Sequence, residues 1–229
     1  ACSFGHHTAK EFGLKSHSES PTSPQESEHA MKGLAETRLS VQTLNRLVVQ
    51  SLLRHNVSAV GISPCFAIPG LPTHDTGFAS LVAVVNSTLH AGLIPVLHGD
   101  ACLYGENGAA ILGGDSLMQA LGTSSLRLTG TVFVTDVQGI YTADPRQVPG
   151  AQLIPVIDVD NEGRVITQVS ATASGHEHDV TGGLDAKLGA AASIASSGND
   201  VVVVKSESQS AEQALKGNKY DVGTLVRKL

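Results

Sequence analysis

The chain has 229 residues, with 15 Lys and Arg against 21 Asp and Glu, which gives a formal net charge of −6. Aromatic residues make up only 3% and tryptophan is absent, so the sequence lacks the basic and stacking surfaces of a nucleic-acid-binding protein. No apolar run reaches the ~18 residues that span a membrane. A chain of this length can bury a hydrophobic core without disulfide bonds or bound metal ions, and one α/β domain is expected.

The three cysteines, Cys2, Cys65 and Cys102, are odd in number, far apart and without CxxC spacing. We therefore expect neither a disulfide scaffold nor a metal site. Cys65 and Cys102 are expected to be small buried hydrophobic residues in a reducing, cytoplasmic environment. The sequence begins with Ala1 and shows no signal or transit pattern, so we expect a processed chain or a part of a longer one.

Predicted elements in the first half of the chain begin with a short helix over residues 9–14. Residues 16–30 are rich in Ser, Pro, Glu and His without an apolar period, which predicts a mobile surface loop. Apolar residues at helical spacing predict a helix over 40–54. A short buried strand is expected over 57–62, followed by a Pro- and Gly-rich loop over 64–76.

A second amphipathic helix is predicted over 78–89. The apolar run 93–97 is bounded by Gly and does not alternate, which is typical of a strand buried on both faces. Further on, the patterns predict helices over 115–121 and 183–195 and strands over 131–135 and 201–204. Since strands alternate with helices, we predict an α/β fold: a three-layer αβα sandwich with a mostly parallel central sheet.

Glycines and acidic residues gather where predicted strands end, which is where an open parallel sheet binds ligands. Residues 98–100 (HGD) are interpreted as turn formers rather than as a metal or acid–base pair. Residues 179–183 (DVTGG) precede a predicted helix, whose N-terminus and Lys187 could hold a phosphate. An ordinary capped helix with a solvated lysine explains the same residues. P-loop, Rossmann and GxSxG hydrolase motifs are absent.

Five segments in this order resemble the amino acid kinase superfamily and, within it, the isopentenyl phosphate kinases. They are residues 3–6 (SFGH), 98–100 (HGD), 111–115 (ILGGD), 134–145 (VTDVQGIYTADP) and 179–183 (DVTGG), the last followed by Lys187. The resemblance covers nearly the whole chain. The fourth and fifth segments are highly specific for the superfamily, and SFGH narrows it to isopentenyl phosphate kinases and the related fosfomycin kinases.

The resemblance implies a single amino acid kinase domain over 1–229, with an acceptor-binding lobe over 1–125 and a nucleotide-binding lobe over 126–229. It implies ATP-dependent phosphorylation of isopentenyl phosphate to isopentenyl diphosphate in isoprenoid biosynthesis, with Mg²⁺ bridging the ATP phosphates. It also implies a homodimer, for which the helix over 40–54 is our candidate surface. No nucleic acid, membrane or protein-ligated metal is implied.

The same resemblance assigns the site residues. His6 would hydrogen-bond the acceptor's phosphate, and Asp115 would orient cationic groups. The implied catalytic residues are His6, Asp115 and Lys187. The acceptor would be bound by Ala1, His6, Gly99 and Gly114. The nucleotide would be bound by Cys2, Asp136, Tyr141, Gly182, Gly183 and Lys187.

The family begins with a strand and a Gly-rich loop carrying a lysine, and this sequence lacks both. We therefore expect this chain by itself to be inactive or nearly so. Two alternatives stay open: a kinase of the same fold for another small phosphate or phosphonate such as fosfomycin, and a catalytically dead nucleotide-binding homologue. An apolar wall would favour the isoprenoid acceptor, and core packing explains its candidates equally well: Leu71, Phe78, Leu81 and Val82.

Overall fold

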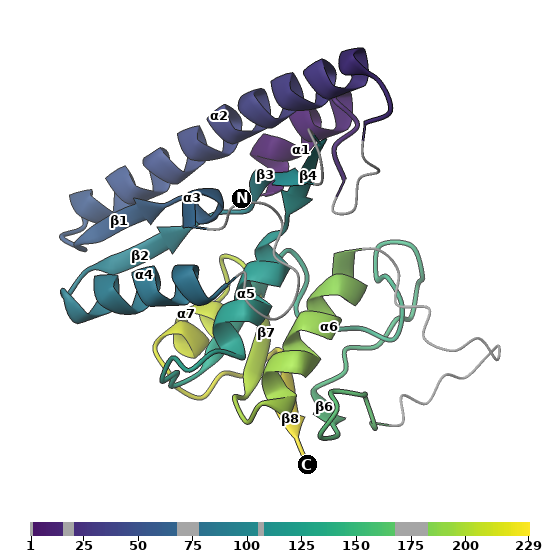
Figure 1. Ribbon diagram of the computed structural model, residues 1–229. Helices are drawn as coiled ribbons and strands as arrows, with labels where there is room; N and C mark the ends of the chain where they lie inside the picture. The colour runs from purple at the N-terminus through teal and green to yellow at the C-terminus, as the bar shows by residue number, and fades with distance from the viewer. Residues whose placement is uncertain (1, 16–20, 68–77, 105–107, 168–182) are drawn as a thin grey trace. The chain divides into compact units, whose positions relative to one another are not determined.

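The structure of the protein is a computed structural model that describes residues 2–15, 21–67, 78–104, 108–167 and 183–229 (Figure 1). It divides into two compact units, Ala1–Leu117 (unit 1) and Met118–Leu229 (unit 2), which we describe separately. In the described part of the chain no helix combines the length and apolar character needed to cross a bilayer.

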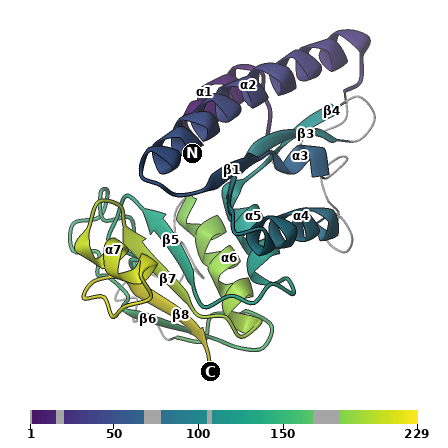
Figure 2. The same cartoon turned by 90° about the vertical axis from the view of Figure 1, so that its left-hand side faces the viewer.

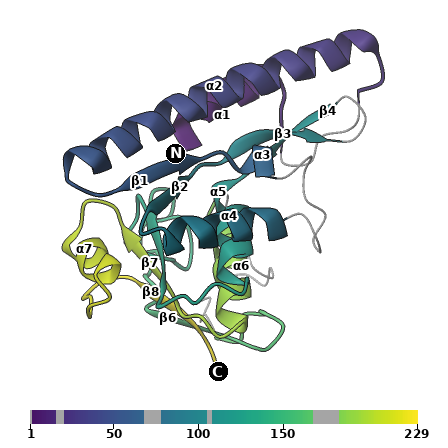
Figure 3. The same ribbon diagram turned by 60° about the vertical axis from the view of Figure 1, so that its left-hand side comes forward.

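Unit 1 has helices on both sides of short strands. The helices are α1 (Cys2–Glu11), α2 (Pro24–Arg54), α3 (Pro64–Ala67), α4 (Ala79–His90) and the start of α5 (Gly114–Gly122). The strands are β1 (Ala59–Ile62), β2 (Ile94–Leu97), β3 (Asp100–Tyr104) and β4 (Gly108–Leu112). β1 and β2 pair in parallel, and β3 and β4 form an antiparallel hairpin. The long helix α2 lies against one side of β1 and α4 lies beside β2 on the other (Figure 3).

Helix α2 is longer than the sequence pattern predicts, because it begins at Pro24 inside the expected loop. The Ser23 hydroxyl accepts a hydrogen bond from the Glu26 N–H at 3.2 Å, and the Glu26 carboxylate accepts one from the Thr22 N–H at 2.8 Å. The first bond satisfies a free N–H group of the first turn, where proline is also favoured, and the second ties the residue before the N-cap to the helix. The loop prediction is therefore wrong for residues 24–30, where capping rather than apolar periodicity starts the helix.

Other predictions for unit 1 are confirmed in part. The helices expected over 40–54 and 78–89 are present, and the first helix spans Cys2–Glu11 rather than 9–14. The prediction that β2 is buried on both faces is wrong, because Ile94 is 47% exposed. Among the described strands, β2 pairs with β1. The β3–β4 hairpin was not predicted. The loop prediction is also wrong for residues 64–67, which form α3, while residues 16–20 and 68–76 of the expected loops lie outside the described residues.

Unit 2 contains a sheet in the order β5 (Thr131–Thr135), β7 (Val201–Lys205), β8 (Thr224–Lys228) and β6 (Val156–Val159). β5–β7 and β6–β8 are parallel, whereas β7–β8 is antiparallel. Helix α6 (Gly183–Ser196) covers one face and α7 (Gln209–Leu215) the other (Figure 2).

Strand β7 is covered by helices on both faces, which explains why apolar and polar residues do not alternate along it. Val201 and Val203 belong to the core under α6, while Val202 and Val204 pack with α7 on the opposite face. A strand covered on both faces favours a continuous apolar run. The αβα layering and the predominance of parallel pairing are confirmed, whereas β6, α7 and β8 were not predicted.

Thr224, the first residue of β8, connects three segments of unit 2. Its side chain is fully buried; the hydroxyl accepts a hydrogen bond from the Ile140 N–H at 2.8 Å and donates one to the Ile154 carbonyl at 2.7 Å. Gly139 makes this approach possible, since a Cβ there would lie 2.6 Å from Thr224 Oγ1. The loop after β5 is thereby tied to β8.

Thr224→Val should lower the free energy of unfolding by about 2–4 kcal/mol, because the buried Ile140 N–H and Ile154 carbonyl both lose their partner while volume is conserved. Thr224→Ser keeps the hydroxyl and should cost about 1 kcal/mol for the lost methyl group. Urea denaturation of the two variants measures the difference. An equal loss in both would contradict the role of the hydroxyl.

Candidate functional site

Gly99 and the Gly113–Gly114 turn lie side by side in unit 1. The β3–β4 hairpin places Asp100 opposite Leu112, so the segments at its two ends meet. A Cβ on Gly99 would lie 3.1 Å from the Leu112 carbonyl oxygen and 3.4 Å from the Gly114 nitrogen. Among the described residues, nothing lies within 4 Å of the position that a Gly114 Cβ would take. Two predicted acceptor-binding residues are thus adjacent, and the Gly114 backbone is open to approach.

Gly114 also begins helix α5, and Asp115 lies in its first turn. The first N–H groups of a helix have no partner inside the helix and carry the positive end of its dipole. This end suits an anion, and the Asp115 carboxylate in the first turn adds a negative charge that can hold a cation nearby. The segment 111–115 therefore combines a backbone that a ligand can approach at Gly114 with the positive end of a helix dipole and the Asp115 carboxylate.

His6 lies on α1 with an exposed side chain. The neighbouring Gly5 is buried against α2, where a Cβ would lie 2.7 Å from Val41 Cγ1. The glycine of the SFGH segment thus allows α1 to pack closely on α2. This packing orders the helix that carries the imidazole.

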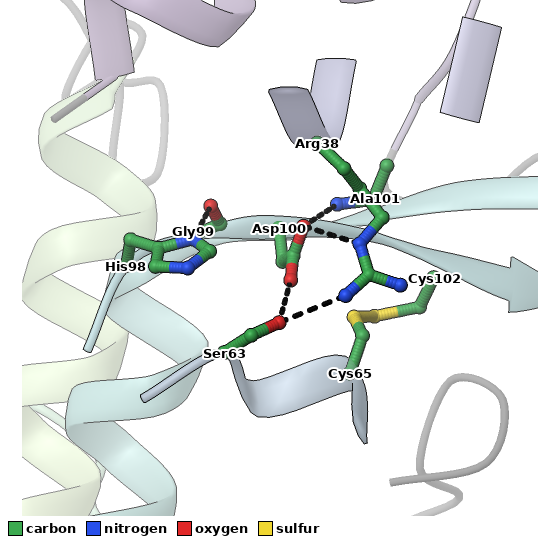
Figure 4. A network of polar contacts seen from close by, with 8 residues as sticks. All are labelled: Arg38, Ser63, Cys65, His98, Gly99, Asp100, Ala101 and Cys102. Atoms are coloured by element: carbon green, nitrogen blue, oxygen red, sulfur yellow. Dashed lines mark hydrogen bonds and ion pairs between the residues drawn. A yellow bond between two sulfur atoms is a disulfide. The ribbon is translucent and has the colours of Figure 1, made fainter. Parts of the chain in front are cut away.

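Asp100, next to Gly99, has a fully buried side chain with several partners (Figure 4). Oδ2 accepts a hydrogen bond from the Ser63 hydroxyl at 2.6 Å, and Oδ1 accepts one from the Ala101 N–H at 2.9 Å. Arg38 Nε lies 3.4 Å from Oδ1, and Arg38 Nη2 donates to Ser63 Oγ at 2.9 Å. Asp100 is therefore a buried strand residue, and its interpretation as a turn former is wrong.

Arg38 and Ser63 were not predicted from the sequence. The available signal was an aspartate immediately before the apolar residues of β3, since a carboxylate at the start of a buried strand requires donors. Nothing in the spacing indicates which donors, because Arg38 comes from α2 and Ser63 follows β1, 62 and 37 residues earlier in the chain.

Cys65 and Cys102 form a disulfide beside this network (Figure 4). Cys65 lies on α3 and Cys102 on β3, with a Cα–Cα distance of 5.6 Å. Cys102 is buried as expected, at 1% exposed. The expectation of two unpaired cysteines is wrong, because the fold brings together positions that are 37 residues apart in the sequence.

In unit 2, the candidate nucleotide residues lie on α6 and on the loop after β5. The Lys187 ammonium lies 5.0 Å from the centroid of the Phe133 ring, within the range of a cation–π interaction. Phe133 belongs to β5, so the cation is held one turn into α6 beside the sheet. This is a partly buried lysine, rather than the solvated one that an ordinary capped helix would present.

Asp136 follows β5 and forms an ion pair with Arg146 on the same loop. The hydrogen bond from the Arg146 guanidinium, assisted by its charge, holds the pKa of the Asp136 carboxyl below its usual value. The Tyr141 hydroxyl donates to Gln138 Oε1 at 3.3 Å. The loop is therefore shaped by its own side chains and by Thr224, with an ionised carboxylate at its start.

Four further predicted site residues lie at or just beyond the start of α1 and of α6. Ala1 and Gly182 lie outside the described residues. Cys2 is the first residue of α1 and Gly183 the first of α6. In the described ranges, no group of three or more His, Cys, Asp or Glu side chains could hold a metal ion.

Residues 1–206 match the amino acid kinase family. The chain therefore belongs to the amino acid kinase family. Within it, the chain is 35% identical over 243 residues to the isopentenyl phosphate kinase of Arabidopsis thaliana, an alignment that covers 99% of this chain and 70% of that protein. It is 27% identical over 225 residues to that of Thermoplasma acidophilum, covering 98% and 81%. A solved isopentenyl phosphate kinase structure, at 24% identity, has the same fold with a TM-score of 0.75, covering 97% and 80% of the two chains.

Replacing both disulfide cysteines, Cys65→Ser with Cys102→Ser, should lower the free energy of unfolding by about 2–4 kcal/mol, because the bond restricts the unfolded chain. Urea denaturation measures the change, and a dithiol reductant should reproduce it in the wild-type protein but not in the double variant. Two free thiols at these positions in the native protein, found by mass spectrometry, would contradict the pairing.

Proposed function

We propose that this protein transfers the γ-phosphoryl group of ATP to isopentenyl phosphate, forming isopentenyl diphosphate and ADP. The observation that carries this proposal is the likeness to isopentenyl phosphate kinases over nearly the whole chain. The geometry supports it, because glycine backbones and a helix N-terminus gather in unit 1 and a held lysine cation lies in unit 2.

Unit 1 would bind the acceptor. His6 would donate a hydrogen bond to the phosphate of isopentenyl phosphate, and the backbones of Gly99 and Gly114 would allow that phosphate to approach closely. Of the candidate apolar wall, Leu81 is fully buried in unit 1, Phe78 and Val82 are partly buried, and Leu71 lies outside the described residues.

Unit 2 would bind ATP. The glycines at 182 and 183 and the N-terminus of α6 would approach the phosphates, with Lys187 neutralising their charge. Asp136 and Tyr141 would line the nucleotide. Mg²⁺ would enter with ATP as part of the MgATP substrate and would neutralise phosphate charge, since Mg²⁺ is held largely by substrate phosphates in such enzymes.

In the transfer, a phosphate oxygen of isopentenyl phosphate attacks the γ-phosphorus, while the bond between that phosphorus and the bridging oxygen of ADP breaks. ADP leaves with the electron pair, so no proton has to move. Catalysis of this step depends on alignment of two anions and on stabilisation of spread negative charge. His6 and Lys187 would supply donors to the acceptor and to ATP, and Asp115 would orient the cationic groups.

A ³¹P NMR time course with MgATP and isopentenyl phosphate tests this function. We expect diphosphate and ADP resonances from a protein that includes the family's N-terminal strand and Gly-rich loop, and little or no turnover from residues 1–229 alone. His6→Ala should lower kcat/KM for isopentenyl phosphate about 100-fold, since a donor to the reacting phosphate is lost. The matched variant His7→Ala, at the neighbouring exposed histidine of α1, should stay within about twofold.

Phosphoryl transfer to fosfomycin but not to isopentenyl phosphate would contradict isopentenyl phosphate as the acceptor and favour the phosphonate alternative. ATP binding without turnover of either acceptor, by folded protein that includes the family's N-terminal segment, would identify a catalytically dead homologue. Equal losses in His6→Ala and His7→Ala would contradict the role of His6.

We also propose that the protein is a homodimer that pairs through α2. Leu39, Leu47 and Leu53 on this helix are 68%, 49% and 53% exposed and fall on one side of it. Sedimentation velocity at micromolar concentration should give a dimer, and Leu47→Glu should shift it toward monomer because a charge would be buried in the interface. A wild-type protein that sediments only as a monomer would contradict the pairing.

A further inference from the structure

We propose that Asp100, Arg38 and Ser63 form a positioning network that fixes Gly99 against the Gly113–Gly114 turn and thereby sets the affinity for the acceptor's phosphate. This inference rests on the proposed function and deepens its acceptor site. The three side chains touch no substrate in this role; they act through the backbone of Gly99.

The burial of Asp100 is the first step of the argument. Its side chain is 0% exposed, and Arg38 beside it is 18% exposed. A carboxylate and a guanidinium withdrawn from water are costly, and well-packed apolar residues of similar volume often give an equally stable fold. Stability alone therefore does not account for a charged network here, whereas the geometric precision of charge-assisted hydrogen bonds does.

The place of the network in the fold is the second step. β1 and β2 are parallel, with Ile62 opposite Leu97, so Ser63 and His98 each follow the carboxyl end of a strand. The hydrogen bond from Ser63 to Asp100, together with Arg38 from α2, ties these two strand ends to each other. Ligands of open parallel sheets bind beyond such ends.

Contact with the acceptor glycines is the third step. Gly99 is covalently bonded to Asp100, and its backbone lies against the Leu112 carbonyl and the Gly114 nitrogen. Gly99 has no side chain that could adapt, so a displacement of Asp100 moves the backbone that faces Gly114. The direction of the Gly114 N–H would change with it.

Ser63→Ala isolates this effect, because the Cys65–Cys102 disulfide holds the same two segments together and should keep the fold intact. The expected result is a KM for isopentenyl phosphate raised about tenfold, the equivalent of one hydrogen bond, with kcat and the KM for MgATP within about twofold. Ser63→Thr retains the hydroxyl and should restore most of the affinity. The matched control is Ser51→Ala, at an exposed serine on α2.

Hydrogen exchange of the ligand-free protein provides a second readout that does not depend on activity. The amides of Gly99 and Gly114 should exchange at least about threefold faster in Ser63→Ala than in Ser51→Ala, with the amides of unit 2 unchanged, because local opening is read out residue by residue. Asp100→Asn, which keeps the shape and removes the charge, should act in the same direction.

An unchanged KM for isopentenyl phosphate in Ser63→Ala, or an equal rise in the KM for both substrates, would overturn the proposal. Unchanged exchange at both glycines would overturn it as well. A wild-type protein that does not phosphorylate isopentenyl phosphate would instead refute the proposed function, and exchange would still decide whether the network holds the glycine segment.

Discussion

A carboxylate buried from water has to be surrounded by donors, and Asp100 imposes this requirement on three distant segments of unit 1. Arg38 must come from α2, Ser63 from the end of β1, and the Ala101 N–H from β3 itself. Once these groups are in place, the end of β1, the end of β2 and the start of the hairpin are fixed relative to one another. The glycines of the candidate acceptor site are the backbone continuation of that arrangement.

In unit 2, a neutral buried hydroxyl, that of Thr224, likewise pairs with groups from distant segments. Thr224 satisfies one N–H and one carbonyl of the loop after β5, and Gly139 leaves the space for it. In both units, hydrogen bonds between a buried polar side chain and distant segments shape a loop of the candidate site. Phosphoryl transfer depends on such positioning, because the enzyme must hold two anions in line rather than supply covalent chemistry.

Much of the fold could be predicted from sequence, since the αβα layering follows from the alternation of amphipathic helices with apolar strands such as 201–204. The parts that could not be predicted are those where local signals are short or polar. The strands of the β3–β4 hairpin are five residues each and mix small with large residues, and the start of α2 depends on a Ser23–Glu26 cap rather than on apolar periodicity. Motifs indicated Gly99, Gly114 and Lys187, but their partners come from elsewhere in the chain.

The sequence by itself determined the family, the αβα class and the identity of the motif residues. Each of these depends on contiguous segments whose residue types and spacing are specific. Only the tertiary structure decided that Asp100 is a buried ion-paired residue, that Cys65 and Cys102 are bonded, and that Gly99 lies against Gly114. The physical reason is that a pairing between distant residues depends on which backbones the packed helices and strands bring together. That proximity is a property of the whole fold, and the local pattern of one partner does not show which residue the other is.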